Sequence, residues 1–498
     1  MAILPAALAG FPLAAQRLSL DEAIRTALQN NLQVTIAQQV REEARSEARS
    51  REGAFDWNLG ADLQASRLKT FSLPPVPGTE VSQTTVTHGR SLTGSLNKLF
   101  PWGGTLAFQY APSYNHARTF WPGGVDGNGN PVAGYGFATP GPYGGSVNAG
   151  YTQSLLRGLG PASTTASLVV ARKQARAADH RFRLAVIQLV ADTETRYWDV
   201  VFAVRALANK RLALELARQQ LQQNTLQVQA GTMAALEVAA AEAQVAKAEQ
   251  DIIAAEARNS NARDTLLRTL HPGGGGTDIL EPSDNPISSC RRMEEAAAIQ
   301  GALQRRAELQ AARIEREVAQ VKERAAADRV RPKLDAFVEY RGASNSYDSL
   351  GPVNSDLAGL SNPGYTVGLS FAVPLQNREA RGRHAAARAQ LSAQGLRLRD
   401  QELSVALEVR RALRDVEAAE KGVQASGKTR HYQEKSLEAE RARFQHGLST
   451  NFTVLKVMTD LDQARSDELK AQIEYAKAVT AMEVALGTLL EARNLTVK

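Results

Sequence analysis

Long apolar runs are missing from this sequence of 498 residues, because none reaches the ~18 residues that a membrane-spanning helix needs. If the chain crosses a membrane, it must therefore do so with β-strands. Cysteine is almost absent: Cys290 stands alone, which excludes a disulfide framework and a cysteine metal site and leaves the redox compartment open. Charge is not concentrated either. The net charge is +7, and arginines alternate with glutamates, a pattern more typical of solvated helix faces than of a nucleic-acid-binding patch.

Proline and glycine are missing from residues 162–228, which predicts one helix about 100 Å long. Apolar residues such as Phe182, Val186 and Val190 recur at spacings of three and four, so this helix is expected to pack against other helices. A second helix of similar length is predicted at 378–445, where four glycines are the only interruptions. Rods of this length do not fit inside a compact domain, and we expect an elongated chain.

Six segments alternate strictly between apolar and polar residues and are predicted to be β-strands: 58–68, 91–99, 105–114, 146–154, 334–342 and 364–373. Their length and two-faced pattern are typical of a transmembrane β-barrel. Of the 28 aromatic residues, 19 lie in 55–151 and 334–375, as expected if rings gather at bilayer interfaces, although strands in any all-β domain also favour aromatics. The Gly/Pro-rich segments 122–145 and 344–363 are predicted to be exposed loops.

The chain is predicted to be a tandem duplication. Residues 231–270 and 447–486 have equal length, and each opens with a glycine turn and ends in Leu. The first repeat, 17–292, contains a helix, strands within 58–154, the long helix 162–228, a return helix 234–270 and a Gly-rich break at 271–286. The second repeat, 293–498, contains a helix, strands within 334–373, the long helix 378–445, a return helix 452–486 and a C-terminal tail. The opening helices, from Leu18 to about Gly53 and from Met293 to Arg329, are each expected to be continuous.

Residues 1–16 are apolar and small, which resembles the core and cleavage region of an export signal without its positive start. We expect a mature N-terminus near Gln16, with a signal that begins upstream. A plain apolar N-terminus is the alternative interpretation.

Four or six strands cannot close into a membrane barrel, because closure needs about eight or more. Open sheet edges are not tolerated in lipid, so several protomers must share one barrel. The hairpin formed by 91–99 and 105–114 is predicted to enter the barrel wall, which gives about six strands per protomer and about 18 per trimer. The alternative is a hairpin above or within a barrel of about twelve strands.

The chain resembles the TolC-like outer-membrane efflux proteins in five features. These are the duplication, the opening Leu18-Ser19-Leu20-Asp21-Glu22-Ala23, the step Ala27-Leu28-Gln29-Asn30-Asn31, the glycine turns and the closing Ala485-Leu486-Gly487. The resemblance covers about Leu18 to Leu490. It implies a mixed α and β membrane protein with a shared transmembrane β-barrel continued by a long periplasmic α-helical barrel. It also implies a homotrimer in the outer membrane of a Gram-negative bacterium that docks onto a periplasmic adaptor and an inner-membrane pump. No catalytic residue, cofactor or metal is implied. The Gly273–Gly276 run agrees, since it lacks the Lys and the strand of a phosphate-binding loop.

The turns at Gly231 and Gly447 are predicted to form the tip of the helical tube and its gate. Many relatives place acidic residues just after the second turn. Here the matching positions hold Thr453 and Lys456, while Glu237 keeps an acidic group in the first repeat. We therefore expect a neutral or basic ring at this position, with Glu237 as a candidate neighbour. The alternative is that Lys456 points outward into water or toward an adaptor.

Two other functions remain open at this stage. A type I protein-secretion exit duct would have the same fold. A soluble coiled-coil scaffold would need only the long helices, but it leaves the two-faced strands and their aromatic residues unexplained. An enzyme is not expected, since no nucleophile and base stand at a convincing spacing.

Overall fold

The computed structural model describes residues 17–72, 82–126, 128–271, 281–286 and 293–495. The chain folds into two compact units, and each unit draws segments from both predicted repeats. The first unit comprises 1–43, 176–315 and 395–498, and the second comprises 44–175 and 316–394. The export signal predicted at 1–16 and most of the Gly-rich break lie outside the described residues. The repeat boundary at 292/293 stays a prediction.

The long helices follow the expected bounds closely. Helix α4 spans Ala166–Gln229, preceded by the short α3 (Pro161–Thr164), and α9 spans Arg378–Gln445. Their 64 and 68 residues correspond to about 100 Å each. The return helices are α5 (Leu236–Leu270) and α10 (Asn451–Leu486), and α11 (Leu489–Ala492) follows in the C-terminal tail. Among the described helices, none has both the length and the apolarity that a membrane span requires.

The prediction of continuous opening helices is wrong. The first divides into α1 (Leu20–Asn30) and α2 (Leu32–Glu52), and the second divides into α6 (Glu295–Arg305) and α7 (Ala307–Arg329). The residues at the breaks, Asn31 and Arg306, are extended, with ψ of 127° and 126°. Each break has its own side-chain anchor: Asn31 donates to the Thr269 carbonyl at 3.0 Å, and Arg306 pairs with Glu408 of α9. Tertiary contacts thus outweigh the helical periodicity that runs across both breaks.

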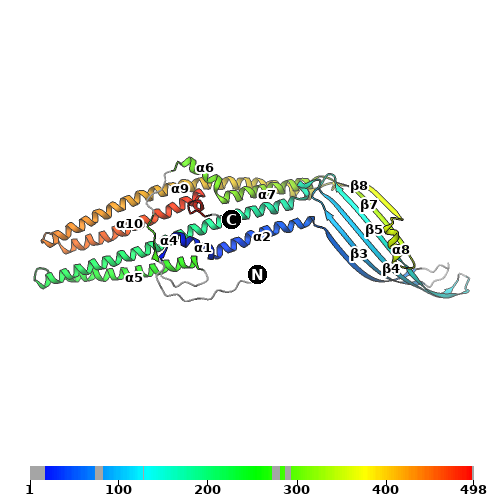
Figure 1. Cartoon of the computed structure of the whole chain (residues 1–498), viewed down its shortest axis with the longest axis horizontal. Coiled ribbons are helices and arrows are strands. Elements are labelled where there is room, and N and C mark those ends of the chain that lie inside the picture. The colour runs from blue at the N-terminus through cyan, green and yellow to red at the C-terminus, as the bar shows by residue number, and fades with distance from the viewer. Residues whose placement is uncertain (1–16, 73–81, 127, 272–280, 287–292, 496–498) are drawn as a thin grey trace. The chain divides into compact units, whose positions relative to one another are not determined.

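Six strands form one antiparallel sheet in the order β2-β3-β4-β5-β7-β8 (Figure 1). The strands are β2 (Asn58–Ser72), β3 (Gln83–Leu99), β4 (Gly104–Val125), β5 (Pro131–Ser154), β7 (Lys333–Ser346) and β8 (Pro363–Ala372). The predicted hairpin is β3–β4, and it lies between β2 and β5 within the sheet, which confirms its insertion there. The outer edges of β2 and β8 have no strand partner among the described residues.

Two predicted loops contain regular structure. Most of 122–145 continues the β4–β5 hairpin, which tolerates its prolines and glycines by shifting register between Tyr114 and His116. The segment 344–363 contains α8 (Leu350–Ala358), which packs on β5 and β7. Val353 and Leu357 of α8 are buried where Gly145 leaves room: a Cβ there would lie 2.6 Å from the Val353 side chain. A short two-stranded pairing joins β1 (Arg17–Leu18) to β6 (Glu281–Pro282).

Four strand ends join helices, and all four lie at one end of the sheet. Helices α2 and α7 run into the starts of β2 and β7, while β5 and β8 run out into α3–α4 and α9. The register places Ser154 opposite Asp335 and Lys333 opposite Ala372, which fixes this common end. We call it the helix end, and we call the opposite end, which carries the β4–β5 turn and α8, the loop end.

The first unit is held together by apolar clusters between its helices. One cluster joins α1, α4, α5 and α10 around Tyr197, Trp198 and Leu270. Another joins α6, α7, α9 and α10 around Leu309, Val409 and Tyr475. Phe182, Val186 and Val190, the apolar stripe that the sequence predicts in α4, are buried as well.

A buried ion network fastens the C-terminal tail to α4 and α10 within the first unit. Arg493 donates two hydrogen bonds to Glu194, at 2.7 and 2.9 Å, and Glu194 also accepts from Thr480 at 2.7 Å. Glu194 is fully buried, and Glu483 lies 3.1 Å from the Arg493 guanidinium. Removal of one partner would leave an uncompensated buried charge.

We therefore expect Arg493→Ala to lower the free energy of unfolding by about 3–5 kcal/mol. As a control, Arg51→Ala removes an exposed ion pair with Glu47 and should cost about 1 kcal/mol or less. Denaturant unfolding of both variants in detergent, followed by circular dichroism, provides the comparison. Equal losses in the two variants would show that the buried network does not hold the tail.

Candidate functional site

One face of the sheet is apolar across all six strands, and we call it the apolar face. The register aligns one row that crosses the whole sheet: Leu59, Leu96, Phe108, Ala149, Tyr340 and Tyr365. Leu63, Leu92, Val338, Val367 and Leu369 belong to the same face, and Leu59 and Leu63 are each 83% exposed. Such an exposed apolar surface has no covering layer within the described chain beyond α8, and it matches the lipid-facing band of a membrane sheet.

The opposite face, called the polar face, carries amides, hydroxyls and glycines. The row next to the apolar one is Gly60, Ser95, Gln109, Asn148, Arg341 and Gly364. Two ion pairs lie on this face: Arg341 with Glu339 at 3.6 Å and Lys333 with Asp335 at 2.9 Å. A face of this kind suits contact with water, so the sheet separates lipid from an aqueous side.

Aromatic side chains flank the apolar band at both ends. At the helix end, Phe100 stacks on Trp102 at 4.6 Å, Trp102 donates to the Tyr151 hydroxyl, and Lys98 lies over the Trp57 ring. Toward the loop end, Tyr114 lies against Tyr143, with their ring centroids 4.7 Å apart. Two such girdles mark the two interfaces of a bilayer.

The predicted tip turns have the same geometry in both repeats. Gly231 and Gly447 take left-handed φ angles of 73° and 72°, a conformation that side chains with a Cβ rarely adopt. The next residue closes each helix end, since Thr232 donates to the Gln227 carbonyl and Leu448 donates to the Arg443 carbonyl. The glycines therefore serve the backbone of each turn.

A buried polar network joins the two hairpin tips. Asn451, the first residue of α10, donates to the Glu237 carboxylate of α5 at 2.9 Å. Gln220 of α4 donates to Asn224 at 2.9 Å and to Asn451 at 3.2 Å, and Asn224 donates to the Glu237 carbonyl. The three amide side chains are at most 3% exposed. The structure thus brings Glu237 into contact with the second repeat, through partners that the sequence reasoning missed.

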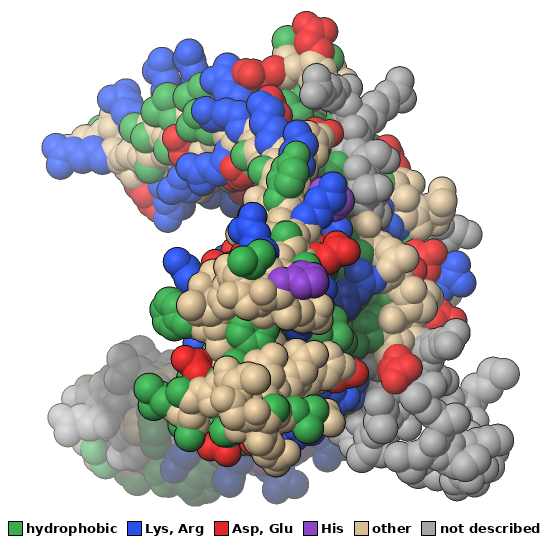
Figure 2. Space-filling model, turned by 90° about the vertical axis from the view of Figure 1, so that its left-hand side faces the viewer, with side chains coloured by type: hydrophobic (Ala, Val, Ile, Leu, Met, Phe, Trp, Pro, Cys, Tyr) green, Lys and Arg blue, Asp and Glu red, His purple; other side chains and the backbone are tan. Residues whose placement is uncertain are grey.

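The remaining predicted tip residues have separate positions. Thr453 takes part in the cap of α10, where its backbone N–H donates to the Thr450 side chain. Lys456 is exposed one turn further along α10. Neither residue contacts Glu237, so these positions do not form one cluster within the protomer. Around the turns, hydrophobic side chains stand exposed in Figure 2, and Leu236, Leu448 and Phe452 are 74–78% exposed.

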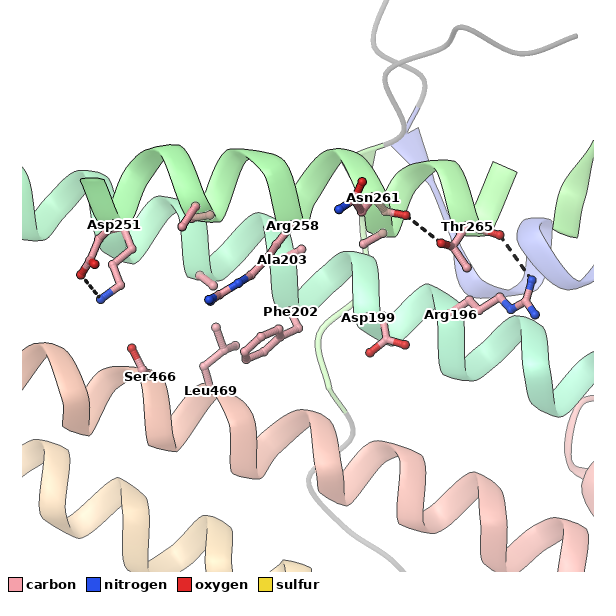
Figure 3. A pocket seen from close by; sticks show the side chains of 15 residues that line it. Arg196, Asp199, Phe202, Ala203, Asp251, Arg258, Asn261, Thr265, Ser466 and Leu469 are labelled. Carbon is pink, nitrogen blue, oxygen red and sulfur yellow. Dashed lines mark hydrogen bonds and ion pairs between the residues drawn. The ribbon is translucent and has the colours of Figure 1, made fainter. Parts of the chain in front are cut away.

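A cavity of about 490 Å³ lies further along the hairpins, between α4, α5 and α10 (Figure 3). Phe202 and Leu469 face each other across it, and Arg258 points into it. Lys210 ties all three helices together, at 3.0 Å from Asp251 and 2.6 Å from Asp462. Partial burial lowers the pKa of Lys210, but the two carboxylates outweigh this and hold that pKa above its usual value.

The amphipathic sheet and the paired helical hairpins agree with the known proteins that this chain resembles. The family model described as "Outer membrane efflux protein" matches residues 298–488. Outer membrane protein TolC of Vibrio cholerae is 26% identical over 336 residues, which cover 66% of this chain and 74% of that protein. In sequence the chain is therefore similar to the TolC-like outer-membrane efflux proteins.

Solved structures show the same fold over nearly the whole chain. One of these is a crystal structure of CusC, from work on its folding and transmembrane channel formation. It aligns with a TM-score of 0.68 at 16% identity, over 94% of this chain and 92% of CusC. VceC from Vibrio cholerae aligns with a TM-score of 0.66 at 16% identity, covering 94% and 96%. The TolC-like proteins are outer-membrane channels and not enzymes, and this chain has their fold.

The role of Lys456 can be tested directly. If Lys456 lines the bore, Lys456→Asp should raise cation selectivity and divalent-cation block, because symmetry repeats the new carboxylate around the axis. Single-channel recordings in planar bilayers measure both properties, with Lys456→Arg as the charge-conserving control. Unchanged selectivity in a well-inserted Asp variant would place the gate at other residues.

Proposed function

We propose that three copies of this chain form one continuous duct, with a shared β-barrel of about 18 strands and a helical tube in the periplasm. The observation that supports a shared barrel is the six-stranded sheet, which has one apolar face, one polar face and, among the described residues, two unpaired edges. Backbone groups along an open edge cannot be left unpaired in lipid. Because β2 starts and β8 ends at the helix end, β8 of one copy can pair antiparallel with β2 of the next copy.

The duct serves as the outer-membrane part of a tripartite efflux system, and it accepts substrates from an inner-membrane pump through a periplasmic adaptor. The exposed apolar residues at the hairpin turns support such docking, since the described chain offers them no cover. Leu236 and Phe452 occupy equivalent positions in the two repeats, because both lie five residues after the turn glycine. Each protomer would thus present two similar contact points.

The buried network around Asn451 gives this duct a closing device. Its hydrogen bonds join α10 of the second hairpin to α4 and α5 of the first, close to the turns. Separation of the hairpins would leave buried amides and a carboxylate without partners, which costs free energy for each group. Contact with an adaptor at the turns could compensate for that cost, and the tip would then open.

Strand pairing between protomers can be tested by disulfide cross-linking in a Cys290→Ser background. Ala61→Cys on β2 should be combined in turn with Val367→Cys, Leu369→Cys or Phe371→Cys on β8. We expect one of the three pairs to yield covalent trimers on oxidation, since the same contact recurs at each of three interfaces. The control pair Ala61→Cys and Gly94→Cys lies within one protomer, on facing positions of β2 and β3, and should add no covalent oligomer.

Only monomers from all three pairs, in protein that conducts in planar bilayers, would contradict the shared barrel. Imaging of the trimer by electron microscopy then counts the strands. Twelve strands in the wall, with β3 and β4 outside it, would overturn the number proposed here.

Docking at the turns can be tested with Phe452→Asp, which places a charge on an exposed apolar contact point. We expect at least a tenfold loss of adaptor and pump co-isolated from cross-linked envelopes of the host, identified by mass spectrometry. Leu236→Asp should act in the same way, and Phe452→Leu should retain binding. Full recovery of the pump with both Asp variants would place the docking surface elsewhere.

A further inference from the structure

Near the loop end, the apolar face carries a group of basic side chains. Five of these side chains are exposed and one is half-buried, and they project from three neighbouring strands: Arg67 and Lys69 on β2, His88 and Arg90 on β3, and His116 and Arg118 on β4. We call them the basic patch. Alternation places them on the same face as Leu59, Leu63, Leu92 and Leu96.

The register gathers the patch into three adjacent rows. Arg67 lies opposite His88, and His88 lies opposite His116. The row above pairs Lys69 with Val86 and Val86 with Arg118, and the row below pairs Ala65 with Arg90 and Arg90 with Tyr114. With strands about 4.8 Å apart and a rise of about 3.3 Å per residue, all six groups fit within about 10 by 13 Å.

Among the residues that the structure describes, no carboxylate forms an ion pair with the patch. On the apolar face of β2, β3 and β4, whose residues are all described, there is no Asp or Glu from Leu59 to Phe71, from Thr84 to Leu96 or from Leu106 to Phe120. Elsewhere in the described chain, arginines commonly pair with acidic side chains, as Arg172 does with Glu52 at 2.7 Å. A group of unpaired like charges is unfavourable by itself, so its position next to a lipid-facing band points to an anionic partner.

The position of the patch on the sheet indicates which kind of anionic ligand it binds. The helices leave from the helix end of the sheet, and they lie in the periplasm in this family, so the loop end faces the cell exterior. The patch therefore lies at the level of the outer-leaflet headgroups, directly above the leucines that contact acyl chains. The outer leaflet of a Gram-negative outer membrane consists of a phosphorylated glycolipid, and arginine forms bidentate hydrogen bonds with phosphate.

We propose that the basic patch binds the phosphorylated diglucosamine headgroup of this outer-leaflet glycolipid, with its acyl chains along Leu63 and Leu92. Arg67, Arg90 and Arg118 donate to the phosphate oxygens, while Lys69 and the two histidines add further N–H donors. Phe71 and Phe120, both exposed on the same face, flank the patch toward the exterior. The inference rests on the proposed function for its orientation in the membrane and adds a lipid-binding site to it.

The test uses delipidated trimer titrated with diphosphorylated lipid A and followed by native mass spectrometry. We expect Arg67→Gln/Arg90→Gln/Arg118→Gln to weaken binding roughly 100-fold, on a scale of about fivefold for each basic residue at an anionic lipid surface. The charge-conserving variant Arg67→Lys/Arg90→Lys/Arg118→Lys should retain most of the affinity. A remote control, Arg381→Gln/Arg397→Gln/Arg399→Gln, removes three exposed charges from α9 and should bind as the unchanged protein does.

Three further binding measurements identify the ligand. Dephosphorylated lipid A with the same acyl chains should bind the unchanged protein as weakly as the Gln variant binds the phosphorylated form. Millimolar inorganic phosphate should not displace the lipid, because the acyl chains contribute to binding. EDTA should leave binding intact, since the contact is direct and not bridged by a divalent cation.

Equal affinity for the phosphorylated and dephosphorylated lipids, or full binding by the Gln variant, would overturn the proposal. Single-channel conductance of every variant separates this result from the proposed function, because a lost lipid site leaves a conducting trimer. If the triple Gln variant does not form trimers, Arg118→Gln alone, which changes a strand away from the sheet edge, should still weaken binding about fivefold.

Discussion

Backbone hydrogen bonding in lipid is the constraint on which the rest of this structure depends. The strands present an apolar face that only a bilayer can cover, yet the sheet has two open edges, and lipid offers no partner for the N–H and C=O groups along them. A single chain with six strands is too small to close a barrel. In the assembly proposed above, neighbouring copies supply the strand partners that both edges lack.

Much of the fold can be predicted from the sequence. Contact with lipid on one face and water on the other makes apolar and polar residues alternate along the strands, and packing between helices requires a stripe of apolar residues along each long helix. The bounds of α9 and the start of β2 follow directly from these patterns. The extent of the loop end could not be predicted. Residues 131–145 are rich in glycine and proline, which usually indicates a loop, but pairing with β4 decides their conformation. The breaks at Asn31 and Arg306 were missed for a similar reason, since the helical pattern continues across them and only tertiary anchors separate the helices.

The contacts at the hairpin tips could be predicted from the sequence only in part. The glycine turns could be found from spacing, and Glu237 could be selected by comparison of the two repeats. Gln220 and Asn224, however, resemble the many polar residues on the solvated faces of α4. Only the approach of α10 buries them and makes their hydrogen bonds obligatory. A comparison of the repeats offers one signal: Asn451 stands where the first repeat has Ala235, so a polar group is added just where the two hairpins meet.

The inserted β3–β4 hairpin also decides how wide the wall of each protomer is. A strand tilted by about 40° occupies about 6 Å of the circumference, so six strands span an arc of about 37 Å. The four helix segments joined to the sheet, at about 9 Å between neighbouring axes, span about 36 Å. With only four strands the arc would be about 25 Å, and the helices would have to converge to meet it. In the trimer proposed above, six strands per protomer would let sheet and helices share one circumference, and no taper would be needed where the outer membrane meets the periplasm.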